Sequence, residues 1–422
     1  MVKTEKIPEG YRATEAGILP VDWQVKRLSE VATELTERAG QDKYETVSIS
    51  AGIGFVNQAE KFGKELSGKQ YEKYIVLHQG DFSYNKGNSK TSPQGCIYRL
   101  NDRETAAVPN VFESFRIEDQ NADYYEQLFL SGFLNKQLYS KINRGVRDDG
   151  LLNLTGKDFY SCAVPVPPIA EQKKIAEVLS CCDRVIELKQ QLIAELQRLK
   201  SGFLQAMFPA KGHSEPDIRF PEFSDAWEQR KFSDLVLIER GGSPRPIDAF
   251  ITDNPNGLNW VKIGDAPEQG RYITKTAEKI KPEGLSKTRE VHPGDLILSN
   301  SMSFGKSYIM GVDGCIHDGW LLIRDTQKRF DLKFLCHMLG TDQMLNQYRA
   351  FAAGSTVNNL NKELVGNTTV TIPSLGEQQI LGQYFENLDH LITLHQRELE
   401  ETKKKKKSLA KLLLTGSVRV PT

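Results

Sequence analysis

The sequence has few cysteines, and none of them follows a metal-binding or disulfide pattern. Its six cysteines include no Cys-x-x-Cys pair and show no regular spacing, so neither a zinc site nor a disulfide framework is indicated. No apolar run approaches the roughly 20 residues that a membrane-spanning helix needs, and the start MVKTEKIPEG is too polar for a signal peptide. We therefore expect reduced thiols, no metal site, no membrane contact and a cytoplasmic location.

The chain also lacks net charge. Lysine plus arginine equals aspartate plus glutamate at 55 each, which excludes the uniform coating of a nucleic acid that histones perform. A protein that reads DNA with this balance must concentrate its basic groups locally. With 422 residues, of which 39% are hydrophobic, the chain should form two to four ordered units, because single cores seldom grow past about 250 to 300 residues.

Complete catalytic motifs are missing as well. Residues 304–307 (FGKS) contain the end of a phosphate-binding loop, but that loop needs a glycine where the sequence has Asn300. Residues 52–57 (GIGFVN) begin like a dinucleotide-binding turn and lack its last glycine. His390 and His395 are five residues apart, whereas a metal-binding pair on one helix face is four apart. We predict no catalytic residue and no metal ligand.

What the sequence does contain is a domain-sized internal repeat. Residues 167–172 (PPIAEQ) match residues 373–378 (PSLGEQ) 206 positions later, and Asp183 and Asp389 keep the same offset. At the front of each copy, a segment around Trp23 aligns with a segment around Trp227. Between these matched ends the two sequences diverge. The repeat predicts two copies with similar frames and dissimilar centres.

Each copy ends in the pattern of a long amphipathic helix. Apolar residues recur at intervals of three and four from about Glu171 to Met207 and from about Glu377 to Leu414. Each helix would be about 55 Å long at 1.5 Å per residue. One such stripe usually indicates ordinary core packing, but two matched helices favour mutual packing in a coiled coil. The helices would run antiparallel if a pseudo-two-fold axis relates the copies.

The centres of the copies predict mixed α and β structure. Helical stretches are expected near residues 124–141 and 331–348. The expected fold is α+β, with two mixed α/β domains at 1–165 and 213–371 separated by two long antiparallel coiled-coil helices within 166–212 and 372–422. Strand-like runs broken by glycine and proline are Thr46–Ser50, Tyr74–Leu77, Cys96–Leu100, Leu258–Ile263, Leu296–Ser299 and Gly319–Ile323.

The repeated Pro-x-x-x-Glu-Gln at the start of each long helix, together with Leu-Pro-x-x-Trp at residues 19–23, resembles the specificity (S) subunits of type I restriction-modification systems. The resemblance covers nearly the whole chain. It implies two target-recognition domains that bind double-stranded DNA, and helical spacers on which two methyltransferase subunits dock, with restriction (translocase) subunits in the same complex. It implies no cofactor in this chain, because S-adenosylmethionine, ATP and Mg²⁺ would serve the partner subunits.

Two alternatives remain open from the residues themselves. One is a coiled-coil scaffold protein without sequence-specific DNA binding. The divergence of the two centres on matched frames argues against it. The other is a nuclease or methyltransferase whose chemistry lies in the divergent centres, and the missing motifs argue against that.

Direct reading of bases needs polar side chains on loops that can enter a groove, with lysine and arginine to hold phosphates. Residues 84–91 (YNKGNSKT) and 299–306 (SNSMSFGK) have this composition, and each follows a Gly-Asp pair in which Asp81 or Asp295 is the expected turn former. Glycine beside arginine near residues 144–147 and 240–245 would allow close approach to phosphate. The candidate DNA-binding residues are Lys86, Asn88, Ser89, Lys90, Arg144, Arg147, Arg245, Asn300, Ser301, Ser303 and Lys306.

Two further features concern the helices. Lysines 403–407 would point in all directions on a helix, so most should be solvated, with contact to the DNA backbone or a subunit as the alternative. Leu192 and Leu196 lie on the apolar stripe and are predicted to bind a methyltransferase subunit. Dissimilar reading loops predict an asymmetric, split target whose half-site centres lie at most roughly 16 base pairs apart, and nearer 10 if the loops overlap the helix ends.

Overall fold

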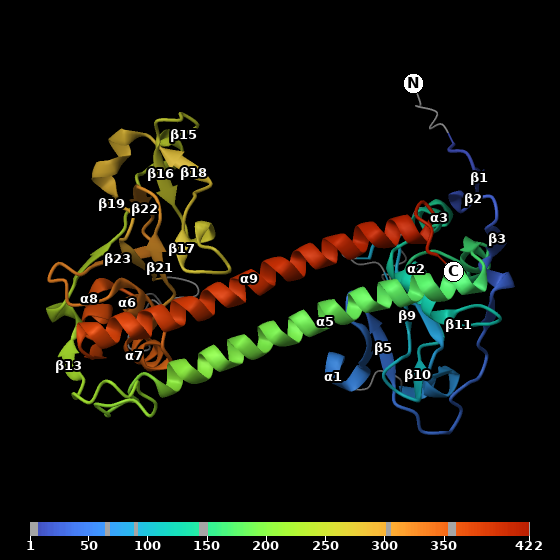
Figure 1. The fold of residues 1–422 in the computed structure, drawn as a ribbon, viewed down its shortest axis with the longest axis horizontal. Helices are drawn as coiled ribbons and strands as arrows, with labels where there is room; N and C mark the ends of the chain where they lie inside the picture. Colours follow the sequence, from blue (N-terminus) through green and yellow to red (C-terminus); the bar gives the residue numbers. More distant parts are fainter. Residues whose placement is uncertain are drawn as a thin grey trace. The chain divides into compact units, whose positions relative to one another are not determined.

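The computed structural model describes residues 7–63, 68–87, 92–142, 151–300, 305–352 and 360–421. The chain forms two compact units (Figure 1): the first unit comprises Met1–Leu188 and Glu400–Thr422, and the second unit comprises Lys189–Leu399. Each unit therefore contains a mixed α/β domain and part of both long helices. None of the described helices combines the length and the apolar character needed to cross a membrane.

The first unit is built around an antiparallel four-stranded sheet in the order β4-β11-β8-β9, with further strands paired as β1–β2, β3–β12, β5–β6 and β7–β10. Aromatic rings of β8 and β11 stack at its centre, where the ring centroids of Phe82 and Phe115 are 5.4 Å apart. The strands are β1 Tyr11–Thr14, β2 Gly17–Pro20, β3 Gln24–Arg27, β4 Ala32–Glu34, β5 Val47–Ser50, β6 Gly54–Asn57, β7 Ile75–His78, β8 Phe82–Asn85, β9 Cys96–Arg99, β10 Thr105–Val108, β11 Glu113–Ile117 and β12 Ala163–Val166, and the short helices are α1 Gln58–Phe62, α2 Ala122–Leu130, α3 Asn135–Lys141 and α4 Gly156–Tyr160.

The second unit contains two five-stranded sheets, in the orders β14-β23-β20-β21-β17 and β15-β18-β16-β22-β19, together with the pair β13–β24. The first of these sheets has the arrangement of the four-stranded sheet of the first unit with one strand added. The strands are β13 Glu228–Lys231, β14 Leu237–Arg240, β15 Ile251–Thr252, β16 Leu258–Val261, β17 Tyr272–Ile273, β18 Glu278–Ile280, β19 Arg289–Val291, β20 Leu296–Ser299, β21 Ser307–Met310, β22 Gly314–Ile316, β23 Trp320–Arg324 and β24 Thr369–Ile372, and the short helices are α6 Leu332–Met338, α7 Asp342–Ala352 and α8 Lys362–Gly366.

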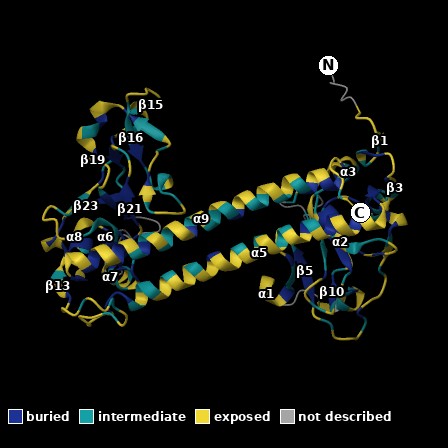
Figure 2. Ribbon diagram, in the orientation of Figure 1, coloured by how far each residue is buried: buried dark blue, intermediate teal, exposed yellow. Residues whose placement is uncertain are grey.

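The two long helices are α5 (Ile169–Ala206, 38 residues) and α9 (Leu375–Leu414, 40 residues), which confirms the predicted helices to within two residues. In the second unit Lys189 pairs with Glu398 at 2.7 Å, and the ring of Phe203 packs on that of Tyr384, so the helices run antiparallel there. In the first unit the start of α5 and the end of α9 share one core cluster. Both helices keep exposed residues along their length, whereas central strands such as β8, β20, β21 and β23 are mostly buried (Figure 2).

The helical stretches expected near residues 124–141 and 331–348 are each divided in two. Gly132 separates α2 from α3 and adopts a φ of +76°, a left-handed conformation that glycine tolerates best. In the second unit, Gly340 and Thr341 separate α6 from α7, and the Thr341 hydroxyl donates to the Met338 carbonyl at 2.8 Å. Apolar periodicity continues across both breaks, because the two short helices of each pair cover the same core.

Candidate nucleic-acid interface

A buried glutamate at the start of α5 joins three distant segments of the first unit. The indole Nε1 of Trp23 donates to Glu171 Oε2 at 3.0 Å. The guanidinium of Arg419, which follows α9, donates to both carboxylate oxygens of Glu171 at 2.6 and 2.8 Å. Arg419 also binds Asp22, and these hydrogen bonds raise the pKa of Arg419. The front of the domain, the start of one long helix and the end of the other therefore meet at a single carboxylate.

The second unit repeats this arrangement at the start of α9. Trp227 Nε1 donates to Glu377 Oε1 at 3.3 Å, and the guanidinium of Arg219 donates to both oxygens of Glu377 at 2.8 Å. Arg219 follows the other long helix, α5, as Arg419 follows α9. The glutamate of the repeated Glu-Gln motif is thus a structural residue of the frame.

The glutamine of the motif holds the next helix of its domain. Gln172 Oε1 accepts the backbone N–H of Asn121 at 3.0 Å, and Gln378 Oε1 accepts that of Asp331 at 3.0 Å. Each glutamine also donates to the carbonyl of a proline just before its own helix. Asn121 and Asp331 are the N-cap residues of α2 and α6. The motif therefore fixes the helix that packs beside the central sheet.

In each unit an aspartate forms the turn before the hairpin that carries the predicted reading loop; we call β8–β9 and β20–β21 the reading hairpins. Asp81 and Asp295 each accept the backbone N–H of the residue three positions earlier, at 2.8 and 2.9 Å, which confirms their role as turn formers. Each carboxylate also receives two hydrogen bonds from an arginine of the neighbouring strand, Arg116 in β11 and Arg324 in β23. Burial would raise the pKa of Asp295, but the bonds from Arg324 and the backbone lower it. These arginines were not singled out from the sequence.

In the first reading hairpin, Lys86 is the candidate DNA-binding residue that lies within the part of the chain that the structure describes. Its Nζ donates to Glu113 Oε1 at 2.8 Å, and its side chain is only 16% exposed. Lys86 therefore anchors the base of the loop to β11 in this structure, and its contact with DNA stays a prediction. The other candidates of the first unit lie outside the described residues: Asn88, Ser89, Lys90, Arg144 and Arg147.

In the second reading hairpin, Asn300 is 2% exposed, and its Nδ2 donates to the Asp318 carbonyl at 2.9 Å. Its own carbonyl accepts the backbone N–H of Leu360 at 2.9 Å, so Asn300 holds the base of this loop. Lys306 is exposed, and only its backbone position is fixed, through a bond to the Ser299 hydroxyl at 3.0 Å. Ser301 and Ser303 lie outside the described residues. DNA binding by Asn300 and Lys306 stays a prediction.

Arg245 is exposed and lines a pocket of about 620 Å³ together with Lys262 and Trp260. The glycines that precede it serve the protein's own packing, because a Cβ on Gly241 would lie 2.2 Å from the His317 carbonyl oxygen. The expected close approach is thus to another part of the chain. Arg245 itself remains free to reach a phosphate, which stays a prediction.

A partly buried ion pair between the long helices occurs at matching positions of the two units. Lys406 of α9 binds Asp183 of α5 in the first unit, and Lys200 of α5 binds Asp389 of α9 in the second. The two lysines are 206 positions apart, as are the two aspartates. The matched aspartates of the repeat therefore help to hold the helices together.

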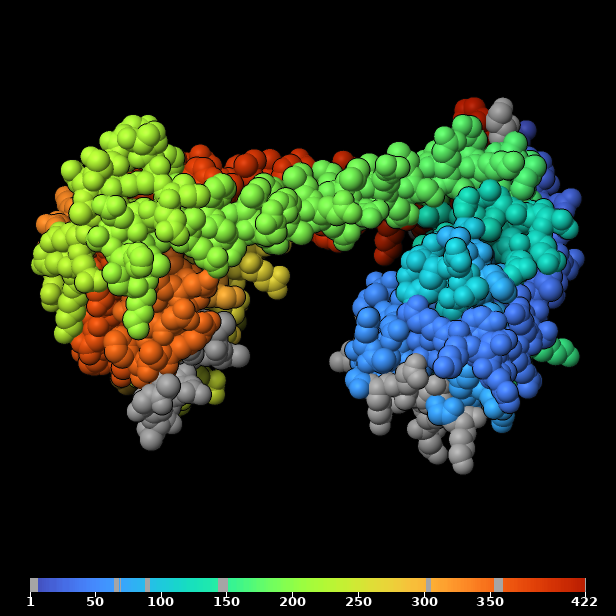
Figure 3. Space-filling model, turned by 90° about the horizontal axis from the view of Figure 1, so that it is seen from below, coloured from blue at the N-terminus to red at the C-terminus, as the bar shows by residue number. Residues whose placement is uncertain are grey.

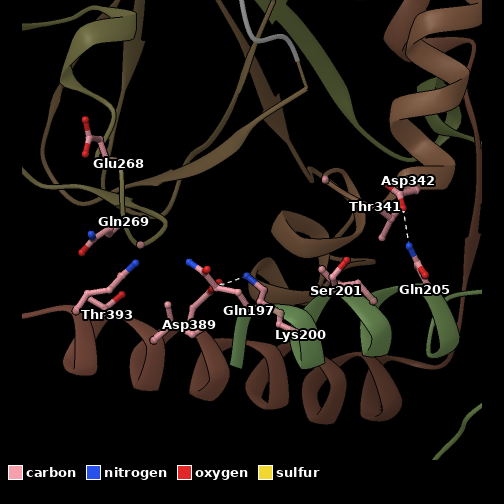
Figure 4. A pocket seen from close by; sticks show the side chains of 15 residues that line it. Gln197, Lys200, Ser201, Gln205, Glu268, Gln269, Thr341, Asp342, Asp389 and Thr393 are labelled. Atoms are coloured by element: carbon pink, nitrogen blue, oxygen red, sulfur yellow. Dashed lines mark hydrogen bonds and ion pairs between the residues drawn. The ribbon is translucent and has the colours of Figure 1, made fainter. Parts of the chain in front are cut away.

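The surroundings of these pairs differ. Gln127 Nε2 donates to Asp183 Oδ2 at 2.8 Å, whereas the equivalent position of the second unit holds His337, whose Nε2 lies 3.8 Å from Asp389 Oδ2. Burial and the nearby cations Arg271 and Lys200 lower the pKa of His337 well below 6.5. Figure 4 shows Lys200 and Asp389 facing each other in a pocket of about 310 Å³.

The predicted partner-binding residues lie on α5, which is exposed in the space-filling view (Figure 3, green). Leu192 is 43% exposed and Leu196 is half-buried, while their neighbour Ile193 is buried. The buried seam thus runs through Ile193 and leaves Leu192 on the surface.

Comparisons with known proteins also find two copies of one domain in this chain. The family model described as the type I restriction modification DNA specificity domain matches twice, at residues 20–198 and 224–404. The MjaVIII specificity subunit of a type I restriction enzyme from Methanocaldococcus jannaschii is 25% identical over 98% of this chain and 96% of its own.

Solved structures show the same fold. A chain from a type I restriction-modification system has a TM-score of 0.60 at 18% identity, covering 95% of this chain and 99% of that one. The S subunit from M. genitalium has a TM-score of 0.56 at 13% identity, covering 97% and 98%.

Proposed function

Because the chain belongs to the family of type I restriction-modification DNA specificity proteins, we propose that each of its units reads one half of an asymmetric, split DNA target. As a specificity subunit, the chain recognises DNA for partner enzymes and is not itself catalytic. The proposal rests mainly on the repeated frame. In both units a glutamate, a tryptophan and an arginine form the same cluster, and an aspartate with an arginine supports the same reading hairpin.

The parts outside the frame support a different target for each unit. The second unit carries the five-stranded sheet β15-β18-β16-β22-β19, which includes the parallel pair β16–β22, while the first unit has the two-stranded pairs β5–β6 and β7–β10. The loops of the reading hairpins, residues 84–91 and 299–306, differ in nearly every side chain. Different donors and acceptors on equivalent hairpins would select different base edges in the major groove.

Exchange of one domain tests this proposal directly. We expect that replacing residues 1–165 by the corresponding domain of a related specificity subunit alters one half of the methylated motif and leaves the other half and the gap unchanged. Genome-wide methylation mapping of cells with the parent and the exchanged subunit measures this. A motif that changed in both halves, or that proved continuous or palindromic, would contradict two separate readers.

The same proposal includes partners. Two methyltransferase subunits would dock on the long helices, and restriction subunits would join the complex. These partners would bind S-adenosylmethionine, ATP and Mg²⁺. The exposed Leu192 beside the buried Ile193 supports a docking face on α5.

Charged residues on that face should weaken the assembly. L192E/L196E, and L192E alone at the more exposed position, should reduce co-purification of the methyltransferase subunits. Q190E adds a charge at an exposed polar position of α5 and should leave assembly intact. Undiminished co-purification of both leucine variants would argue against docking at this face.

A further inference from the structure

A groove of about 620 Å³ lies in the first unit between the end of α9 and the turn that joins α2 to α3. Its apolar side includes Phe129, Phe133 and Leu134. The α9 side is cationic, and no aspartate or glutamate is among the described residues that line the groove. The lysines that line it are Lys403, Lys406, Lys407 and Lys411.

Three of these lysines are available to a ligand. Lys406 is committed to Asp183 in the partly buried ion pair. Among the described residues Lys403 forms an ion pair with Glu400 alone, in an exposed i,i+3 contact of 2.8 Å that water screens strongly. Lys407 and Lys411 are exposed and form no ion pair within the described part of the chain. Positions 403, 407 and 411 are four apart, so they share one helix face and span about 12 Å.

The second unit has the same groove without this charge. At the positions 206 residues earlier, α5 places Gln197, Ser201 and Gln205 against the equivalent pocket (Figure 4). Gln205 Nε2 donates to Asp342 Oδ2 at 3.0 Å there, and Glu268 also lines that pocket. The fold therefore does not need lysines at these positions, which leaves them open to a role in binding.

We propose that Lys403, Lys407 and Lys411 hold the sugar-phosphate backbone of DNA beside the first reading hairpin, an inference that rests on the proposed function. The groove reaches that hairpin, since Tyr84 of β8 and Gly95 just before β9 also line it. A strand that flanks a major groove entered by this loop must pass beside the hairpin. A row of about 12 Å matches the axial rise of three to four nucleotides at 3.4 Å each. Such contacts position the duplex and carry no sequence information.

The variant K403Q/K407S/K411Q tests the proposal, because it gives the first unit the side chains of the second. It would be prepared as the complex with its methyltransferase subunits and titrated with two duplexes, one containing the methylated motif and one scrambled. We expect affinity at 0.15 M salt to fall roughly tenfold to a hundredfold on both duplexes. The slope of log affinity against log salt should fall by about 2.7, or 0.9 for each lost contact.

Two controls separate charge from structure. K404Q/K405Q removes two exposed lysines of the same helix that do not line the groove and should leave the slope unchanged. K403R/K407R/K411R keeps the charges and should retain both slope and affinity.

Each other outcome is informative. If the wild-type complex prefers the motif duplex but the triple variant keeps its salt slope, the inference is wrong and the proposed function stands. Loss of the methyltransferase subunits with an unchanged slope would identify a protein-docking groove and would also overturn it. A wild-type complex that bound both duplexes equally would overturn the proposed function, and an unchanged salt slope in the triple variant would then overturn this inference as well.

Discussion

The two units agree at the starts of the long helices and differ at their ends. Glu171 and Glu377 each receive a tryptophan N–H and an arginine from matching places in their units. At the helix ends, Lys403, Lys407 and Lys411 of one unit are replaced by neutral side chains in the other. The glutamates of the first set are buried and hold the front of each domain against its long helix. The second set faces outward and can change without disturbing the fold, so geometry and recognition are assigned to different residues.

The strongest test of the shared frame is to remove its glutamates. E171A and E377A each leave a buried indole N–H without its acceptor and remove the buried carboxylate partner of an arginine. Each should therefore reduce the free energy of unfolding of its unit by about 2 to 5 kcal/mol, with E171A at the low end because Arg419 keeps its ion pair with Asp22. E377A should have the larger effect, because the side chain of Arg219 is 15% exposed and that of Arg419 is 42% exposed. Denaturant unfolding followed by hydrogen exchange in each unit measures this. E195A, at an exposed position, is the control. If E195A reduced the free energy of unfolding as much as E171A and E377A do, the structural role of the two buried glutamates would be wrong.

A smaller difference should appear at the ion pairs between the helices. D389N leaves Lys200 next to Arg271 without a counter-charge in a mostly buried place, and should reduce the free energy of unfolding by about 2 to 3 kcal/mol. D183N should reduce it by about 1 kcal/mol or less, since the Asp183 side chain is 44% exposed. Denaturant unfolding midpoints of D389N and D183N, each compared with the wild-type protein, measure this difference. Equal effects would mean that the surroundings of the two pairs do not matter.

The smallest effect should be one of pH. The folded pKa of His337 lies below its unfolded value of 6.5, so the unfolded chain binds this proton first. The contribution of neutral His337 to stability is therefore full above pH 6.5 and is lost as the pH falls below 6.5, by up to about 1.4 kcal/mol per pH unit. H337Q, which installs the residue type of the first unit, should remove this part of the acid sensitivity. Thermal unfolding of the wild-type protein and of H337Q between pH 7 and 5.5 measures this difference. If the stability of both proteins fell in parallel with pH, His337 would not be the group responsible.

The sequence predicted the long helices, the two-copy organisation and the turn aspartates, because periodicity, repeated motifs and Gly-Asp pairs are local signals. It did not predict the partners of the buried carboxylates. These partners include Arg116, Arg219 and Arg419, which come from segments outside the matched frames. Hydrophobic periodicity predicts that one face of a helix is buried, but it does not predict which residues pack against that face. Of the five-stranded sheet β15-β18-β16-β22-β19 only β16 was predicted, because the other strands have only two or three residues each. Most candidate base contacts lie outside the described residues, so that part of the site still rests on the sequence.

The contact between Arg419 and Glu171 determines the order in which the two units can be completed during synthesis at the ribosome. The second unit is one continuous stretch, Lys189–Leu399, whereas the first needs Glu400–Thr422 to be complete. The Tyr11 hydroxyl donates to the Gly416 carbonyl, 405 positions along the chain, and Arg419 closes the cluster around Trp23. The first unit therefore begins to emerge before the second unit and is completed only after it. Until residues 413 and 414 have been synthesised, the core surface that Leu413 and Leu414 cover stays open, and a nascent chain in this state is exposed to misassembly with a neighbouring copy.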